Sequence, residues 1–268
     1  MKTALTIAGS DSGGGAGIQA DLKTFSAHGV FGMSAITAVT AQNTMEVRSV
    51  QPIETAIISD QIAAIFEDIP VDAVKIGMLG SKEIVETVAA SLKTFMPSIV
   101  ILDPVMISKS GHHLLDGRAV SALKMDLLPL ATLVTPNVPE AEVLTGLSIR
   151  TEQDFYKACI SIQEMGPKAV LLKGGHAAGN PNDLFYNGTD FQWIEGERIH
   201  TKNTHGTGCT LSSAITSNLA NGLPLQESIE QAKTYISEAI RNSFSIGKGH
   251  GPVHHFHSFS KKERSELI

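Results

Sequence analysis

The sequence predicts an α/β fold with a mostly parallel sheet covered by helices on both faces. Short apolar runs alternate with amphipathic segments along the 268 residues. The runs are continuously apolar, as in strands buried on both faces. With 24 glycines and only 5% aromatic residues, the composition suits many strand-to-helix turns. We expect a single domain over residues 1–268, with a frayed polar tail at 258–268.

Strands are expected where short apolar runs end near glycine, proline or aspartate. In chain order they are Thr3–Ala8, Met33–Thr40, Val71–Ile76, Ile99–Leu102, Leu133–Val134 and Ala169–Leu172. Helices are expected where apolar residues recur at spacings of three and four. In chain order they are Ala16–His28, Ile57–Phe66, Lys82–Phe95, Phe155–Met165, Thr207–Asn221 and Leu225–Phe244. Asn187-Gly188 between two apolar runs predicts an antiparallel hairpin over Asp183–Trp193, near one sheet edge.

Composition excludes several classes of protein. The net charge of −6 argues against a nucleic-acid partner, because non-specific polyanion binders are normally basic. Two cysteines cannot form a disulfide framework. The first apolar run ends at Gly9-Ser10-Asp11, too early for a signal-peptide core, and no stretch approaches the roughly 20 apolar residues that span a bilayer. We expect a cytoplasmic protein without a membrane partner.

The first motif is the glycine-rich loop at residues 9–17, directly after the first strand. Position 18 is Ile18, so the dinucleotide-binding fingerprint is incomplete, and the ending of a P-loop is missing. Glycines allow a ligand to approach the backbone closely. Asp11 and Asp21 add the directional acceptors that a small polar substrate needs. The alternative interpretation is a flexible turn.

The second motif, His205-Gly206-Thr207-Gly208-Cys209-Thr210, opens a predicted helix. Glycines at a helix start expose backbone N–H groups where the helix dipole is positive, a combination suited to a transferring phosphate. Cys209 lies in the first turn, where the pKa of a thiol tends to fall, so a thiolate base or a substrate contact is plausible. The alternative is helix capping with a buried cysteine.

Three further motifs follow predicted strands, at the sheet edge where ligands bind in parallel α/β folds. Asp103 and Glu140 supply oxygen donors suited to Mg²⁺, directly or through water. Lys173 offers positive charge toward a phosphate, and Gly174-Gly175 permits close approach. Taken alone, each of these motifs is more often a turn or a helix cap.

Two other features receive structural interpretations. His250, His254, His255 and His257 suggest zinc, but neither cysteine nor carboxylate lies at ligand spacing beside them. Cys159 falls within a predicted helix and is interpreted as a packing residue.

Together these segments resemble the ribokinase-like superfamily of small-molecule kinases, whose fold is a three-layer αβα sandwich. More narrowly, they resemble the bacterial hydroxymethylpyrimidine/phosphomethylpyrimidine kinases of the thiamine pathway. The resemblance runs from Leu5 to about Phe259. It is carried by AGSDSGGGAGIQADLKTF, TAQNT, KIGML, DPVM, TPNVPEAE, KGGH, KNTHGTGCT and GPVHHFH. The last segment further weakens the zinc interpretation.

The resemblance implies two successive ATP-dependent phosphorylations of a pyrimidine alcohol, giving first a monophosphate and then a diphosphate. It also implies ATP, Mg²⁺ and a homodimer. The matching positions fall into four groups. Those for the pyrimidine pocket are Gly9, Asp21, Gln42, Met78, Val105 and Cys209. Those for ATP and magnesium are Asn137, Glu140, Lys173, Gly174, Gly175 and Thr207, with Asp103 and Glu140 as metal ligands. The anion hole matches Gly206, Thr207 and Gly208. Catalysis would involve these three residues together with Lys173 and Cys209, and Cys209 stands where the superfamily usually has an aspartate base.

Three alternatives remain at this point. A pyridoxal or pyridoxine kinase of the same branch shares the glycine loop and the Gly-Cys helix start, although Gln42 favours a pyrimidine. A nucleotide-binding oxidoreductase is disfavoured by the missing fingerprint glycine and by the lack of an acidic residue after the second strand. A non-catalytic protein on the same fold is disfavoured because the anion-hole motif and both carboxylates are present.

Overall fold

The computed structural model describes residues 1–106, 117–175 and 180–259. The frayed tail expected at 258–268 lies, apart from its first two residues, outside them. The main sheet contains β1 (Thr3–Ala8), β2 (Phe31–Ile36), β5 (Ala73–Ile76), β6 (Val100–Leu102), β7 (Leu133–Val134), β8 (Val170–Leu172), β9 (Asp183–Tyr186) and β10 (Phe191–Ile194). The helices are α1 (Gly17–Ala27), α2 (Thr55–Asp68), α3 (Lys82–Phe95), α4 (Gly117–Ala122), α5 (Val138–Thr145), α6 (Glu152–Gln163), α7 (Thr207–Ala220) and α8 (Leu225–Arg241).

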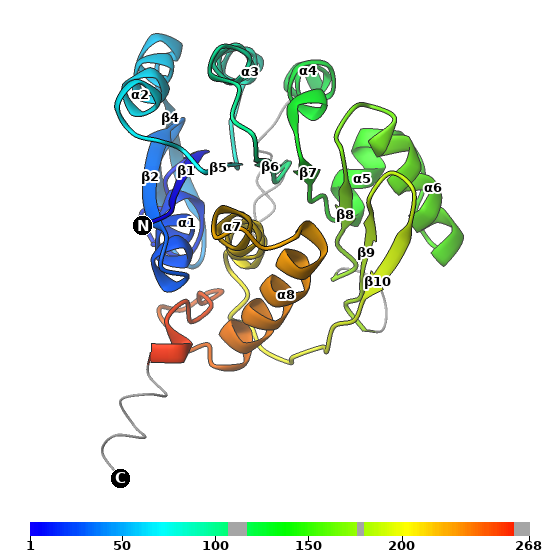
Figure 1. Cartoon of the computed structure of the whole chain (residues 1–268). Coiled ribbons are helices and arrows are strands. Elements are labelled where there is room, and N and C mark those ends of the chain that lie inside the picture. The colour runs from blue at the N-terminus through cyan, green and yellow to red at the C-terminus, as the bar shows by residue number, and fades with distance from the viewer. Residues whose placement is uncertain (107–116, 176–179, 260–268) are drawn as a thin grey trace.

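The sheet has the strand order β10-β9-β8-β7-β6-β5-β1-β2. Every neighbouring pair from β2 to β8 is parallel, whereas β9 and β10 are antiparallel to their neighbours. Helices cover both faces (Figure 1). The predicted mostly parallel α/β sandwich is therefore confirmed.

Alternation along the central strands builds a separate core on each face of the sheet. Val100 and Leu102 pack in one cluster with α2, α3, α4, α5 and α6, while Ile101 between them packs in a second cluster with α7 and α8. The helix α1 lies on the same side as α7. The strands are buried on both faces, which explains their continuous apolar runs.

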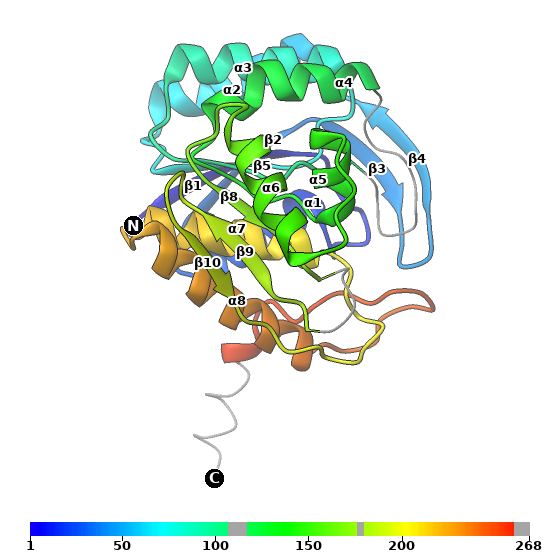
Figure 2. The same cartoon turned by 90° about the vertical axis from the view of Figure 1, so that its right-hand side faces the viewer.

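The predicted strand Met33–Thr40 is wrong, because the chain leaves the sheet at Thr37. Residues before it form β2, and those after it form β3 (Ala38–Gln42), which pairs with β4 (Val47–Pro52) in a separate two-stranded sheet. This small sheet stands beside the main one in Figure 2. β4 was not predicted, because this strand is polar and mostly exposed rather than apolar. The consequence is that Gln42, at the end of β3, reaches the rim of the cavity described below.

The predicted hairpin at the sheet edge is confirmed. β9 and β10 are joined through a turn in which Asn187 Oδ1 accepts hydrogen bonds from the backbone of Thr189 and Asp190, 2.8 and 2.7 Å away. Tyr186 and Phe191 stack across the two strands, with ring centroids 4.2 Å apart. Among the described residues, no helix combines the length and the apolar composition that crossing a bilayer requires.

Candidate active site

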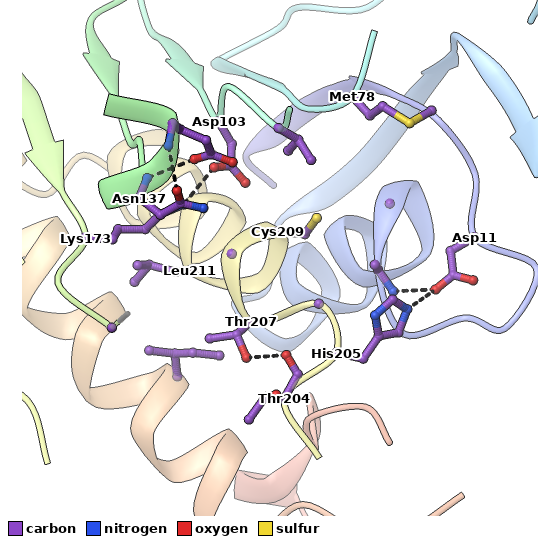
Figure 3. A pocket seen from close by; sticks show the side chains of 18 of the residues that line it. Asp11, Met78, Asp103, Asn137, Lys173, Thr204, His205, Thr207, Cys209 and Leu211 are labelled. Atoms are coloured by element: carbon purple, nitrogen blue, oxygen red, sulfur yellow. Dashed lines mark hydrogen bonds and ion pairs between the residues drawn. The ribbon is translucent and has the colours of Figure 1, made fainter. Parts of the chain in front are cut away.

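A cavity of about 670 Å³ opens at the carboxyl ends of the parallel strands. Loops that follow β1, β5, β6, β7 and β8 form one side of it, and the first turn of α7 forms another (Figure 3). Of the residues predicted from the sequence, those that line the cavity are Gly9, Asp11, Gln42, Met78, Val105, Asp103, Asn137, Glu140, Lys173, Gly175, Gly206, Thr207, Gly208 and Cys209. The topology explains why they meet, since the carboxyl ends of parallel strands share one edge. Asp21 and Gly174 do not line the cavity.

The first turn of α7 has the geometry of a helix start that binds anions. Gly206 is the N-cap residue, with φ of 78°, and no side chain caps the helix. The N–H groups of a first turn have no partner within the helix, and the helix dipole makes their surroundings positive. Thr207 Oγ1 donates a 2.8 Å hydrogen bond to the carbonyl of Thr204, which fixes the approach to the turn. The turn can therefore hold a phosphate without any cationic side chain of its own.

An ion pair faces this helix start. Lys173 Nζ lies 2.9 Å from Asp103 Oδ1, which also accepts a hydrogen bond from Thr135 Oγ1 at 3.2 Å. A Cβ atom placed on Gly208 would stand 3.5 Å from both Asp103 Oδ2 and Lys173 Nζ, so the glycine keeps this gap open. Burial disfavours charge on Lys173, but Asp103 and Glu140 outweigh burial and raise the pKa of its ammonium group. Lys173 is therefore a cation next to the anion-binding turn.

Glu140 belongs both to a helix cap and to this charged cluster. Asn137 Oδ1 accepts from the Glu140 backbone N–H at 2.9 Å, and Glu140 Oε2 accepts from the Asn137 backbone N–H at 2.8 Å. The capping interpretation of this motif is thus correct as local structure. Burial, together with nearby Asp103, raises the pKa of Glu140 although Lys173 acts in the opposite direction. Within the described ranges, no group of three or more acidic, histidine or cysteine side chains is arranged to hold a metal.

The expectation that Asp21 contacts the substrate is corrected by its position. The side chain is fully buried beneath the cavity, and Oδ2 accepts from Lys75 Nζ at 2.9 Å and from Thr6 Oγ1 at 2.6 Å. Its Oδ1 accepts from Ser213 Oγ at 2.7 Å. Both oxygens are engaged because an unpaired buried carboxylate is costly. Asp21 therefore neutralises Lys75, a fully buried cation that lines the cavity and whose role was not predicted.

The expectation of a lowered thiol pKa at Cys209 is also corrected. Burial raises the pKa of Cys209 to about 11, while the charge of Lys75 acts in the opposite direction. The same burial disfavours charge on Lys75, but Asp21, Cys209 and Asp103 outweigh it and hold the pKa of Lys75 above its ordinary value. At neutral pH the site thus contains a neutral thiol above an ammonium group. The first-turn position alone does not generate a thiolate.

Gly174 has a structural role that differs from the expected contact with nucleotide. Its backbone N–H donates to Asp183 Oδ1 at 2.9 Å, and a side chain at this position would overlap the carbonyl oxygen of Asn182. Asp183 also forms an ion pair of 2.6 Å with Lys233 of α8. Lys233 and Asp183 both line the cavity, and neither was predicted. Their signal in the sequence is weak, because an isolated lysine on an amphipathic helix is usually solvated.

The cavity is also lined by the residues expected to surround an organic acceptor. Met78 packs over Gly9, where any Cβ would collide with its terminal methyl group. Gln42 and Val105 line the same cavity. His205, for which no role was predicted, turns its ring toward Asp11 in the glycine-rich loop (Figure 3).

Comparisons with known proteins agree on one family. The family profile described as phosphomethylpyrimidine kinase matches residues 11–254. A hydroxymethylpyrimidine/phosphomethylpyrimidine kinase of Haemophilus influenzae is 49% identical over 96% of this chain and 97% of its own. The thiamine biosynthesis bifunctional protein ThiED of Geobacter sulfurreducens is 52% identical over 94% of this chain, which spans about half (51%) of that relative.

Solved structures of two kinases have a similar fold. The phosphomethylpyrimidine kinase of Clostridium difficile is 50% identical, with a TM-score of 0.82 over 90% of this chain and 100% of that one. An ADP complex of Bacillus subtilis pyridoxal kinase is 40% identical, with a TM-score of 0.90 over 97% and 99% of the two chains. The predicted fold class is confirmed by these neighbours.

Proposed function

The chain belongs to the phosphomethylpyrimidine kinase family, and we infer from this that it is an ATP-dependent kinase of thiamine biosynthesis. It phosphorylates 4-amino-5-hydroxymethyl-2-methylpyrimidine and then the resulting monophosphate, which yields the diphosphate. The observation that carries this conclusion is the single cavity in which the acceptor wall of Gly9, Gln42, Met78 and Val105 lies next to the first turn of α7. Phosphoryl transfer requires this juxtaposition of acceptor and phosphate site.

The anion hole and Lys173 supply the electrostatic part of the proposed mechanism. In the transition state, negative charge spreads over the oxygens of the transferred phosphoryl group. The backbone N–H groups of Gly206–Gly208 and the ammonium of Lys173 are already oriented before reaction, so little reorganisation is required. The acidic protein thereby concentrates its positive potential in the cavity rather than over its surface.

Asp103 and Glu140 fit a magnesium ion by their chemistry. Both are buried carboxylates beside the anion-binding turn, and Mg²⁺ is usually held by one or two carboxylates together with phosphates and water. The proposed ion, when bound, would neutralise charge on the phosphates of ATP. Lys173, which already pairs with Asp103, would hold that carboxylate in place.

We propose that Cys209 accepts or relays the proton of the acceptor hydroxyl. Its thiol lines the cavity between the acceptor wall and the phosphate site, with Lys75 below it to favour the thiolate when the proton is transferred. Cys209→Ala should lose much of the turnover while still binding ATP, and Cys159→Ala is the matched control, because Cys159 lies buried outside the cavity. Turnover of Cys209→Ala within about threefold of wild type, or about 0.7 kcal/mol, would exclude Cys209 as the base.

The assay that tests the function is ATP-dependent conversion of the pyrimidine alcohol, with mono- and diphosphate followed by mass spectrometry. Failure to form either product would refute the assignment. A second candidate is a pyridoxal kinase, favoured by the close structural match to the enzyme of B. subtilis. Steady-state rates on both alcohols separate the two, and a higher kcat/KM for pyridoxal would reverse our choice. The homodimer and the cytoplasmic location stay predictions, and light scattering of the purified protein tests the first.

A further inference from the structure

We propose that His205 is a positioning residue, which with Asp11 clamps the glycine-rich loop to the first turn of α7. The clamp would hold the acceptor wall and the anion hole in one fixed alignment. This inference rests on the kinase function proposed above and adds a residue that this function did not use. The pair joins segments 194 positions apart in the sequence.

The side chain of Asp11 accepts hydrogen bonds from several backbone N–H groups of the glycine-rich loop. Its Oδ1 accepts from the Gly13 N–H at 2.8 Å, and its Oδ2 accepts from the Gly15 and Ala16 N–H groups at 3.0 and 2.8 Å. His205 Nε2 lies 2.8 Å from the same Oδ2, with only 3% of the Asp11 side chain and 13% of the His205 side chain exposed. A carboxylate with so many donors is fixed in orientation, so the ring of His205 is fixed with it.

The protonation of Asp11 agrees with this arrangement. Burial acts to raise the pKa of Asp11, but the hydrogen bond and charge of His205 and the N–H groups of Ala16 and Gly13 outweigh burial and lower it. Asp11 is therefore an ionised acceptor at neutral pH. Because an ionised Asp11 can only accept, the proton of this hydrogen bond is on His205 Nε2 and points toward Asp11.

The proton on His205 Nε2 also limits the hydrogen bonds that Gln42 can form with the ring. Its amide nitrogen lies 3.3 Å from His205 Nε2, but the ring nitrogen already donates to Asp11 and has no lone pair to offer. The Gln42 amide therefore touches the ring nitrogen whose direction Asp11 fixes. Gln42, the residue expected to read the acceptor ring, lies in direct contact with the clamp.

Backbone packing leaves no freedom between the two clamped segments. A Cβ on Gly206 would overlap the carbonyl oxygen of Gly15, and a Cβ on Gly15 would collide with the ring of His205. The residue after His205 is Gly206, the N-cap of α7, so the backbone of His205 leads directly into the anion hole. A contact that merely stabilised the fold would not need to lie between these two parts of the cavity.

The clamp is tested by a substitution that removes the Nε2 donor of His205 but keeps the volume of its side chain. His205→Met should lower kcat on the pyrimidine alcohol at least thirtyfold and change the KM for ATP less than threefold, because the first-turn amides remain. His205→Gln places an amide N–H near the position of Nε2 and should recover most of the loss. The matched control is His250→Gln, since the side chain of the exposed His250 bonds the Lys202 carbonyl and lies outside the cavity.

Two outcomes would overturn the proposal: a kcat of His205→Met within threefold of wild type, or His205→Gln as impaired as His205→Met. If His205→Met does not fold, nuclear magnetic resonance of the wild-type His205 ring decides. Its signals should move when the alcohol is added without ATP, and unchanged signals at saturation would count against the clamp. A wild-type protein that does not phosphorylate the alcohol would instead refute the underlying function.

Discussion

Acidification should weaken this protein through His255, which is buried behind the anion-binding helix. Its Nε2 shares a 3.1 Å hydrogen bond with Thr210 Oγ1 of α7, and Tyr235 of α8 donates to its carbonyl at 2.7 Å. Burial lowers the pKa of His255 from 6.5 to about 4, and the charge of Lys23 acts in the same direction. His254 and His257 add to the effect when they are protonated. The folded protein therefore holds the ring neutral near neutral pH.

The direction and size of the loss of stability follow from the difference between the pKa of His255 in the folded protein and its ordinary value. Above about pH 6.5 the ring is neutral in both states, so His255 contributes no pH dependence. Below that pH the unfolded chain takes up a proton that the folded chain refuses, and stability falls until about pH 4 is reached. The complete loss is about 3 kcal/mol, of which about 2 kcal/mol falls between pH 7 and pH 5.

Urea unfolding at pH 7, 6 and 5 measures this contribution. His255→Gln keeps a hydrogen-bonding group for Thr210 but cannot titrate, so its free energy of unfolding should fall about 2 kcal/mol less than that of wild type over this range. His200→Gln, at an exposed position, should retain the wild-type slope. Equal slopes for wild type and His255→Gln would refute the reasoning.

The remaining predictions concern the buried ion pair and the helix start. Lys75→Met should cost about 3–5 kcal/mol in urea unfolding, because Asp21 is left buried without its cation, and a loss below about 1 kcal/mol would contradict the pairing. Gly206→Ala should reduce kcat at least tenfold, because its Cβ overlaps the Gly15 carbonyl. Gly222→Ala, also at positive φ but in open space, is the control for backbone strain, and equal effects on kcat would exclude the overlap as the cause.

Much of the fold could be predicted because its signals are local. The strand Thr3–Ala8 and the helix Lys82–Phe95 begin and end as the periodicity predicted. The small sheet of β3 and β4 could not be predicted, since nothing local shows that an apolar run leaves one sheet at Thr37 and joins another. There, partners distant in the sequence decide the structure.

The candidate site was predictable where glycine or strand-end motifs mark it, and not where charges meet in the interior. Asp21 was assigned to the substrate because its sequence position beside the glycine loop says nothing about Lys75, 54 positions away. A signal did exist: Lys75 is a lysine within an apolar strand, which requires a buried counter-charge. The thiol of Cys209 was misjudged because burial, which outweighs helix position, is not visible in the sequence.

The clamp between Asp11 and His205 also fixes when, during synthesis, this protein can become an enzyme. The glycine-rich loop leaves the ribosome early, while α7 and α8 emerge only after the last strand of the sheet. Until then the sheet face that those helices cover has no partner, and the anion hole does not exist. Nascent chains therefore cannot transfer phosphate, and the apolar residues that α7 and α8 later cover stay exposed. The late non-local contacts, such as the one between Gly249 and Thr44, 205 positions apart, should make folding slow.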